Sequence, residues 1–319
     1  MSRRVGAMAV LESVPNVSEG RDPAVVVAIA DAFGSAGSRV LDTHVDADHH
    51  RAVVTLVGDD RSLEDGLVAG IDEARRRIDL RRHVGVHPRV GAADVVPLVP
   101  LERGDLVRAA TVANTVGRRV GEELGVPVFL YGALGDGRRP AFYRRGGPET
   151  LQARIDDGEL VPAYGPRRLD ARAGAVLVGV RAPLLAFNLE LRGSMEAAVA
   201  LAASVRESSG GLPGVQALAL ELGGGVQLST NVVDLEATAP HVLVERVVKE
   251  AVARGLAVGH GELVGLIPAA SVAQAAAAAG VEEPLDPAGL PTPAALEAAA
   301  RVLRLERLDA DRVLEWHLR

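Results

Sequence analysis

Hydrophobic positions in the first half of the chain alternate between a helical and a strand-like period. Apolar residues recur three or four positions apart through residues 62–78, the spacing of one helix face. Residues 51–58 are rich in Val and Thr, which favours a strand. The predicted elements of this half are a strand at 7–13, a helix at 23–33, strands at 39–43 and 51–58, a helix at 62–78 and a strand at 94–101. This order is βαββαβ.

The remainder continues with a helix at 106–124, a strand at 126–131, a loop at 135–147 and a short helix at 148–157. The second half then predicts strands at 174–180 and 184–191, a helix at 194–206, strands at 216–222 and 226–233, a helix at 240–254 and a strand at 256–267. The repeated order predicts an α+β fold of two βαββαβ-type sandwich subdomains, each a mixed sheet with helices on one face, with a cleft between them. We place the subdomains at 1–178 and 179–319.

Composition narrows the class of protein without deciding the function. The formal net charge is −7, so the chain has no basic footprint for nucleic acid. Cysteine is absent, which excludes disulfides, thiolate metal sites and a cysteine nucleophile. No apolar stretch approaches the roughly 18 residues of a membrane span. We therefore expect a cytoplasmic protein without a membrane or nucleic-acid partner.

Five of the eight histidines lie between His44 and His87, in two polar clusters. The first cluster, residues 42–50, holds Asp42, Asp46 and Asp48 together with His44, His49 and His50. Alternate residues of a strand share a face, so Asp42, His44, Asp46 and Asp48 could point one way. A metal site, a substrate contact and a solvated polar turn all remain open for this cluster.

The second cluster lies in a loop and joins His87, Arg89 and Asp94, with His83 shortly before them. Pro88 disfavours helical geometry at His87. Histidine titrates near neutrality, and arginine forks onto carboxylates. This residue set suits proton transfer near an anionic substrate, whereas the simpler alternative is a loop histidine bonded to backbone.

Two further segments carry candidate binding groups. Residues 16–21 include Asn16 and Arg21, which suit a substrate carboxylate or a helix cap. The loop at 165–174 is basic and could receive a polyanion or simply be solvated. Neither a G-x-x-x-x-G-K-[ST] phosphate loop nor a G-x-S-x-G nucleophile elbow occurs in the sequence.

Seven segments, in order, resemble the glutamate formimidoyltransferase family. They are Val14-Pro15-Asn16-Val17-Ser18-Glu19-Gly20, His87-Pro88-Arg89-Val90-Gly91-Ala92-Ala93-Asp94, Val126-Pro127-Val128-Phe129-Leu130-Tyr131-Gly132, Arg144-Arg145-Gly146, Leu185-Ala186-Phe187-Asn188, Val226-Gln227-Leu228-Ser229-Thr230-Asn231 and Glu262-Leu263-Val264-Gly265-Leu266-Ile267-Pro268. The second segment is similar to the family's His-Pro-Arg-x-Gly-Ala-x-Asp signature. Together the segments span about residues 10–270, most of the chain.

The resemblance implies formimidoyl transfer between N-formimidoyl-L-glutamate and tetrahydrofolate, a step of histidine degradation and one-carbon metabolism. It implies tetrahydrofolate as co-substrate, no metal, a homodimer, and folate in the cleft between two subdomains. The mammalian proteins carry an additional cyclodeaminase domain, which the resemblance does not extend to here.

The resemblance places the catalytic histidine at His87 and the folate-binding loop at 165–174. The family has an Asp-x-Asp pair after its second strand, whereas this chain has Asp42-Thr43-His44, so Asp42, Asp46 or Asp48 would have to replace the missing carboxylate. The catalytic candidates are His87, His44 and Asp42. The substrate-binding candidates are Asn16, Arg21, Arg51, Arg89, Asp94, Gly165, Pro166, Arg167, Arg168, Leu169, Asp170, Ala171, Arg172, Ala173, Gly174, Asn188 and Asn231.

Three alternatives to formimidoyl transfer stay open at the level of sequence. The same scaffold could move a formyl group, from N-formylglutamate or in 5-formyltetrahydrofolate chemistry. A metal-dependent hydrolase could be built on residues 42–50. A folate-binding protein without catalysis is the third alternative.

Overall fold

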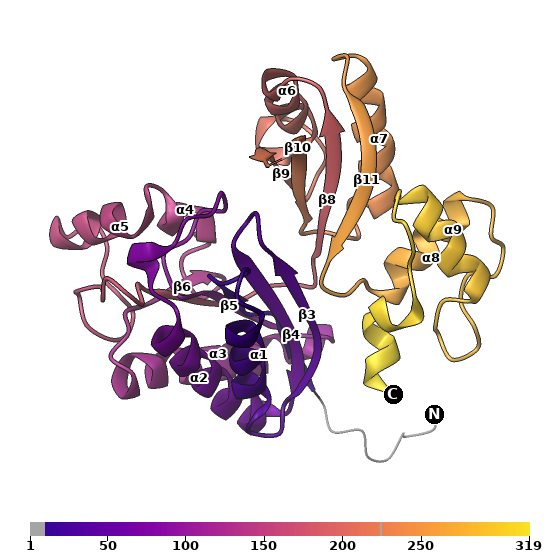
Figure 1. The fold of residues 1–319 in the computed structure, drawn as a ribbon. Helices are drawn as coiled ribbons and strands as arrows, with labels where there is room; N and C mark the ends of the chain where they lie inside the picture. Colours follow the sequence, from indigo (N-terminus) through magenta and orange to yellow (C-terminus); the bar gives the residue numbers. More distant parts are fainter. Residues whose placement is uncertain (1–9, 224) are drawn as a thin grey trace. The chain divides into compact units, whose positions relative to one another are not determined.

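The computed structural model describes residues 10–223 and 225–319 and divides the chain into two compact units, residues 1–182 and 183–319. Each unit is built around its own sheet (Figure 1). Residues 7–9 of the strand predicted at 7–13, and Gly224 of the glycine turn between two predicted strands, lie outside the described residues. The α+β class and the two-sheet organisation are confirmed.

The first unit contains a seven-stranded sheet in the order β1-β4-β2-β5-β7-β6, with β3 paired to β4. Its elements are β1 (Leu11–Ser13), β2 (Asn16–Val17), α1 (Pro23–Gly34), β3 (Arg39–Asp46), β4 (Arg51–Gly58), α2 (Asp60–Arg77), β5 (Ala93–Val99), α3 (Leu106–Glu123), β6 (Val128–Gly132), α4 (Pro140–Arg144), α5 (Gly147–Asp156) and β7 (Val176–Val180). Strands β5, β7 and β6 are parallel and the other pairs antiparallel, so the sheet is mixed.

Helices α1 and α2 begin where the sequence supplies capping groups. Asp22 accepts hydrogen bonds from the backbone N–H groups of Ala24 and Val25, and Pro23 occupies the first helical turn. Asp59 accepts from the N–H of Ser62, at the start of α2. The last turn of α2 is basic, which complements the helix dipole. These local signals explain why both helices match their predicted positions closely.

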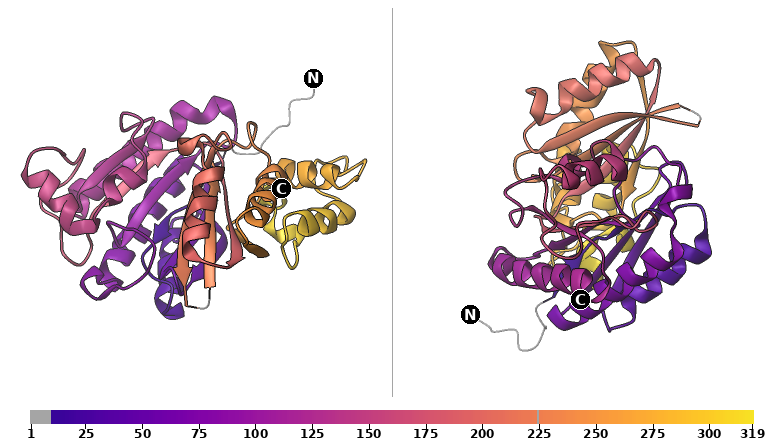
Figure 2. Two further views of the ribbon diagram at one scale, coloured as in Figure 1. Left: turned by 90° about the horizontal axis from the view of Figure 1, so that it is seen from above. Right: turned by 90° about the vertical axis from the view of Figure 1, so that its left-hand side faces the viewer.

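Different helices pack on the two faces of the first sheet. Helices α1, α2 and α3 pack on one face, over a core that includes Leu56, Leu63 and Val178 (Figures 1 and 2). On the opposite face, Phe129 and Leu177 pack with residues of α4 and α5. Strand alternation puts the polar residues of β3 and the odd-numbered residues of β4 on this second face. The candidate site lies there.

Strand β7 belongs to the first unit's sheet. The sequence analysis grouped the strand at 174–180 with the second half, but β7 pairs in parallel with both β5 and β6. Its residues Val176 and Val178 are buried in the core under α1–α3. The two units meet between Ala182 and Pro183 along the chain.

The second unit has the predicted βαββαβ order. Its elements are β8 (Leu185–Arg192), α6 (Met195–Val205), β9 (Val215–Leu222), β10 (Gly225–Val232), α7 (Pro240–Val252), β11 (Ala257–Val264), α8 (Ala269–Ala278) and α9 (Pro293–Val302). The four strands lie in the order β11-β8-β10-β9, and every pair is antiparallel, whereas a mixed sheet was predicted. Two strands joined by a helix run in the same direction, as β8 and β9 do through α6, and β10 and β11 through α7. In the order β11-β8-β10-β9 the two strands of each such pair are not neighbours, so every hydrogen-bonded pair is antiparallel.

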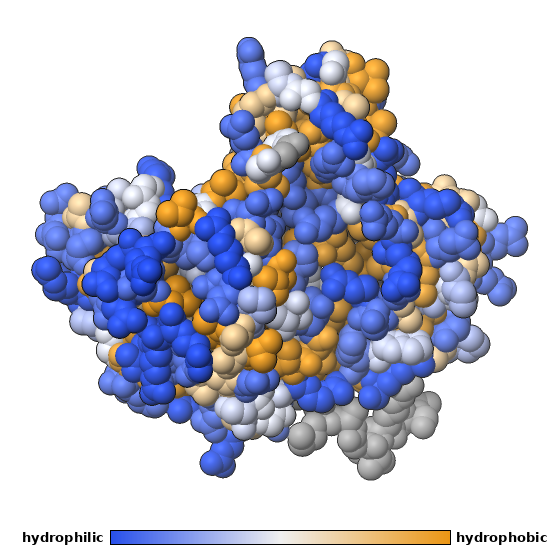
Figure 3. All heavy atoms as spheres, in the orientation of Figure 1, coloured by the Kyte–Doolittle hydropathy of each residue, from blue (hydrophilic) through white to orange (hydrophobic). Residues whose placement is uncertain are grey.

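Among the described residues, no helix is both long enough and apolar enough to cross a membrane. Charged residues instead cover much of the helical surface of the first unit. The part of that unit that carries α4 and α5 is strongly hydrophilic (Figure 3). Its exposed side chains include Arg138, Arg139, Arg145, Arg167 and Arg168.

Candidate active site

The loop that carries His87 is anchored to two neighbouring segments. The N–H of Ala92 donates to the carbonyl of Ala173 at 2.8 Å, and the N–H of Ala175 donates to the carbonyl of Val90 at 2.9 Å. The hydroxyl of Ser18 donates to the carbonyl of Gly91 at 2.7 Å. These bonds tie together residues 16–21, the His-Pro-Arg loop and the end of the loop at 165–174, three segments that the sequence identified separately.

His87 accepts a hydrogen bond at Nε2 from Nη1 of Arg51, at a distance of 2.9 Å. A guanidinium only donates, so Nε2 carries the lone pair and the proton of the neutral ring is on Nδ1. Burial lowers the pKa of His87 far below its usual value, and the positive charges of Arg51, Arg144, His49 and Arg89 lower it further. His87 is therefore neutral at physiological pH, which is the form that takes up a proton.

Arg89 shapes the loop in which it lies. Its Nη2 donates to the carbonyls of Gly85 and His87, both at 2.7 Å. This bracing fixes the backbone on both sides of Val86 and holds a cation beside the imidazole. The sequence analysis assigned Arg89 to substrate binding, and the structure adds this second role within the loop.

Asp94 and Arg144 form a buried ion pair beneath the loop. Asp94 Oδ1 also accepts from the N–H of Val90 at 2.7 Å, so this carboxylate holds the backbone of the loop rather than the imidazole of His87. Arg144 comes from the end of α4 and its positive charge acts on His87. The sequence analysis quoted Arg144 only within a motif, and that motif was the one signal for its place in the site.

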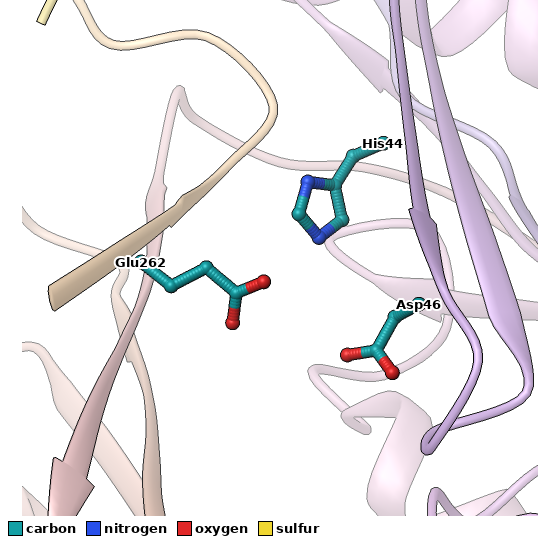
Figure 4. A group of neighbouring side chains, drawn as sticks. All are labelled: His44, Asp46 and Glu262. Carbon is teal, nitrogen blue, oxygen red and sulfur yellow. The ribbon is translucent and has the colours of Figure 1, made fainter. Parts of the chain in front are cut away.

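Strand β3 presents Asp42, His44 and Asp46 on the sheet face opposite α1–α3. Figure 4 shows the His44 and Asp46 side chains leaving the same side of the strand. The register places His44 beside Val53 and Asp46 beside Arg51 on β4, and Asn16 of β2 also pairs with Val53. The Asn16 amide donates to the carbonyl of Val14 at 3.0 Å. Asn16, His44 and Arg51 thus share one polar face of the sheet.

Asp46 binds His49 with both carboxylate oxygens. Oδ2 pairs with Nδ1 of the imidazole, and Oδ1 accepts from the His49 backbone N–H at 2.8 Å. Burial raises the pKa of Asp46, but the hydrogen bonds and charge of His49 outweigh it and lower this pKa to about 2. The ring centroids of His49 and His87 lie 6.2 Å apart. Sequence reasoning named Asp46 as a replacement carboxylate and missed His49 as a site residue.

His50 fastens the turn after β3 to the His87 loop. Its Nε2 lies 3.1 Å from Oε1 of Glu19, and its Nδ1 lies 3.0 Å from the carbonyl of Val84. The rings of His50 and His83 stack with centroids 3.9 Å apart, and His83 Nε2 lies 2.9 Å from the His50 carbonyl. Both ring nitrogens of His50 thus face acceptor oxygens.

Arg21 lies at the opposite end of the same turn. Its Nε donates to the carbonyl of Ala47 at 3.0 Å. Gly20 is packed so closely that an added Cβ would lie 2.1 Å from the Asp46 carbonyl oxygen. Asp48 is exposed in this turn, and its carboxylate pairs with no side chain in the described ranges 10–223 and 225–319.

The loop at 165–174 is held at its end and exposed in its middle. Asp170 accepts from the N–H of Arg172 at 2.6 Å, and the Leu80 N–H donates to the Arg172 carbonyl at 3.0 Å. Gly174 has a φ of 70°, and a Cβ there would meet the Val90 carbonyl oxygen at 2.0 Å. Arg167 and Arg168 are exposed. The exposed side chains of Arg167 and Arg168 are therefore carried by a loop whose C-terminal end is held in place by hydrogen bonds.

The remaining predicted residues belong to the second unit. Asn188 is buried on β8 and donates through Nδ2 to Oε2 of Glu262 at 2.9 Å, and Gln227 donates to the same oxygen at 3.3 Å. Glu262 is the third residue drawn in Figure 4. Asn231 lies on β10, on the same polar face of the second sheet as Asn188. The side opposite carries the apolar core under α6 and α7.

Residues 42–50 hold several carboxylates and imidazoles that could serve as metal ligands. Taken by itself, the described part of that unit brings no three His, Asp or Glu ligand atoms within 4.8 Å of one another. Asp46 is engaged through both oxygens by His49. Asp46 and His49 are thus bonded to each other, whereas His50 bonds outside the cluster, to Glu19 and to the carbonyl of Val84.

Comparison with known proteins gives a consistent picture along the chain. Residues 10–181 match the model of the formiminotransferase domain, N-terminal subdomain, and residues 186–281 match that of the formiminotransferase domain. A glutamate formimidoyltransferase from Thermoplasma acidophilum is 38% identical over 272 residues, covering 82% of this chain and 89% of that protein. The Streptococcus pyogenes serotype M1 glutamate formimidoyltransferase is 34% identical over 267 residues, with coverage of 82% and 89%. The Gallus gallus formimidoyltransferase-cyclodeaminase is 37% identical over 279 residues, but the match spans only 51% of its length.

Proposed function

The chain belongs to the formiminotransferase domain family, and we propose that it transfers a formimidoyl group between N-formimidoyl-L-glutamate and tetrahydrofolate with His87 as a proton-transfer residue. It is a transferase of one-carbon groups, and tetrahydrofolate is its co-substrate. The observation that carries the role of His87 is the environment of its imidazole, which is kept neutral among cations.

The reaction is a substitution at an amidine carbon. The N5 amine of the folate attacks this carbon, a tetrahedral intermediate forms, and the C–N bond to glutamate breaks with the electron pair going to nitrogen. N5 must lose a proton, and the departing amine must gain one. Neutral His87 accepts the first proton after the Arg51 guanidinium has moved away from Nε2. General base catalysis of this kind typically raises the rate by about 10²–10⁴-fold.

The positive charges around His87 suit substrates that carry carboxylates. We propose that Arg51 and Arg21 bind carboxylate groups of the donor, with Arg89 contributing from the loop that it braces. A fork of guanidinium N–H groups matches a carboxylate in geometry and charge. When a carboxylate draws Arg51 from Nε2, the lone pair of His87 is freed, which couples substrate binding to activation of the base.

The loop at 165–174 is the proposed folate-binding segment. The C-terminal end of this loop is held by hydrogen bonds, and the exposed guanidinium groups of Arg167 and Arg168 suit a ligand that carries carboxylates. On the second unit we propose substrate contacts at Asn188 and Asn231. We also propose a homodimer located in the cytoplasm; sedimentation of the purified protein and localisation of a tagged copy test these two statements.

The decisive test is an assay of formimidoyl transfer from N-formimidoyl-L-glutamate to tetrahydrofolate. Wild type should turn over, and His87→Ala should lower kcat by at least about 10²-fold while the protein stays folded. His317→Ala, in the C-terminal segment, is the matched control. A folded His87→Ala protein with near wild-type kcat contradicts the assignment.

The same assay separates the alternatives. Turnover of N-formylglutamate or 5-formyltetrahydrofolate in place of the formimidoyl donor would indicate formyl chemistry. Loss of activity on chelation, with metal found by elemental analysis, would favour the hydrolase. Tight folate binding without turnover of any donor would indicate a binding protein.

A further inference from the structure

Two imidazoles with opposite hydrogen-bond partners lie side by side in the first unit. His87 accepts at Nε2 from the Arg51 guanidinium, whereas Nδ1 of His49 pairs with the carboxylate of Asp46. The ring centroids are 6.2 Å apart and the rings meet edge to face, at 61°. One ring is therefore held by a cation and the other by an anion.

A carboxylate at Nδ1 fixes the proton on that nitrogen and stabilises the imidazolium. In His49 the restraint is doubled, because Asp46 also accepts from the backbone N–H of the same residue at 2.8 Å. The carboxylate stays ionised through the physiological range, since its pKa is lowered to about 2. The pair thus fixes the orientation of the His49 ring.

The far side of the His49 ring is left for a ligand. The residue is 2% exposed, although it lies in the turn between β3 and β4. Within residues 10–223 and 225–319, no protein group hydrogen-bonds to its Nε2. This nitrogen is therefore open to solvent and to a ligand.

We propose that His49, oriented by Asp46, is a second catalytic residue, which protonates the departing glutamate nitrogen while His87 takes the proton from N5 of the folate. This division of roles rests on the proposed function. The 6.2 Å between the ring centroids brings the two imidazoles to one place in the first unit.

The step balances in atoms and charge. The N5–carbon bond forms as the N5 proton passes to Nε2 of His87. The carbon–nitrogen bond to glutamate then breaks, its electron pair remains on nitrogen, and Nε2–H of the His49 imidazolium supplies the proton. Proton exchange with solvent, from His87 and to His49, restores both rings for the next turnover.

The charged groups around the pair come from several elements. Asp46 lies on β3, Arg51 on β4, Arg89 in the His87 loop and Arg144 at the end of α4. The three arginines favour the neutral form of His87, whereas the one carboxylate of the group is bonded to His49. The proposed acid and the proposed base are thus two different residues, and their nearest charged neighbours have opposite signs.

The test compares His49→Gln and Asp46→Asn with wild type and with Asp48→Asn, an exposed carboxylate of the same turn. We expect His49→Gln to lower kcat about 10²-fold with little change in either KM, and to remove from the kcat–pH profile the limb on which activity falls as pH rises. Asp46→Asn should lower kcat about tenfold and move that limb to lower pH. Added imidazole should restore part of the activity of His49→Ala.

The outcomes distinguish this proposal from the one on which it rests. If wild type transfers the formimidoyl group but His49→Gln keeps its kcat within about twofold and its pH profile unchanged, the role of His49 is refuted and the proposed function stands. If wild type itself transfers no formimidoyl group, both are overturned. Circular dichroism and thermal unfolding show whether each variant is folded, and an unfolded His49→Gln shifts the decision to Asp46→Asn and its pH profile.

Discussion

Arg51 and His87 are joined by a hydrogen bond of 2.9 Å from the guanidinium Nη1 to the imidazole Nε2. A cation in direct contact with the lone pair both occupies the base and opposes its protonation. The bond also links β4 to the His-Pro-Arg loop, so the position of the imidazole depends on the sheet as well as on its own loop. Nε2 of His87 is thus available to another group only when Arg51 moves away from it.

Replacing Arg51 by Met should raise the pKa of His87 toward its ordinary value, because the nearest positive charge and the competing donor are both removed. Titration of the imidazole signals by NMR measures this directly. The exposed Arg82→Gln in the same unit is the control and should leave the titration unchanged. An unaltered His87 titration in Arg51→Met would show that Arg51 contributes nothing to the lowered pKa.

Asp94→Asn should destabilise the protein by about 3 kcal/mol, because it leaves the buried cation of Arg144 without its partner. Urea unfolding at neutral pH measures the free energy of unfolding. The double variant Asp94→Asn with Arg144→Met removes both charges and should recover part of that loss. Equal stability of the single and double variants would show that the ion pair is not the main contribution of Asp94.

Gly91→Ala should displace the His87 loop. An added Cβ would lie 1.9 Å from the backbone oxygen of Ala175, a contact that only backbone movement relieves. We expect a loss of about 2 kcal/mol in stability together with a fall in kcat. Gly104→Ala, where nothing lies within 4 Å of the new atom, should change neither quantity. Wild-type kcat in Gly91→Ala would show that the loop tolerates the shift.

Local signals in the sequence were sufficient for most of the secondary structure. The apolar period of residues 62–78 predicts α2 to within a few residues, because this signal acts within one helix. The membership of β7 was not predictable in this way. Its place depends on parallel pairing with β5 and β6, a long-range choice that an apolar run of five residues does not encode.

The candidate site shows the same division between local and long-range information. His87 stands out through its own motif, but its partner Arg51 lies 36 positions away, and Arg144 is 50 positions from Asp94. The Asp46–His49 pair is local, three residues apart, yet the polar run from 42 to 50 offers several equivalent pairings. Only the register of β3 with β4 and the turn between them decide which carboxylate meets which imidazole.

His83 should make the protein less stable as the pH falls from about 6.5 to about 4. Burial lowers its pKa to about 4, with further contributions from the charges of Arg89 and His50. Between these two pH values the unfolded chain binds a proton at His83 and the folded chain does not. The contribution of His83 to the free energy of unfolding therefore rises with pH across this window and is constant above it. The variant His83→Gln keeps a donor for the His50 carbonyl but has no group that titrates in this range. The difference in the free energy of unfolding between pH 7 and pH 4.5, measured with urea, should be smaller in this variant than in wild type by about 2 kcal/mol. The control His317→Gln should retain the wild-type dependence, and a His83→Gln protein with the same slope as wild type would show that other groups cause it.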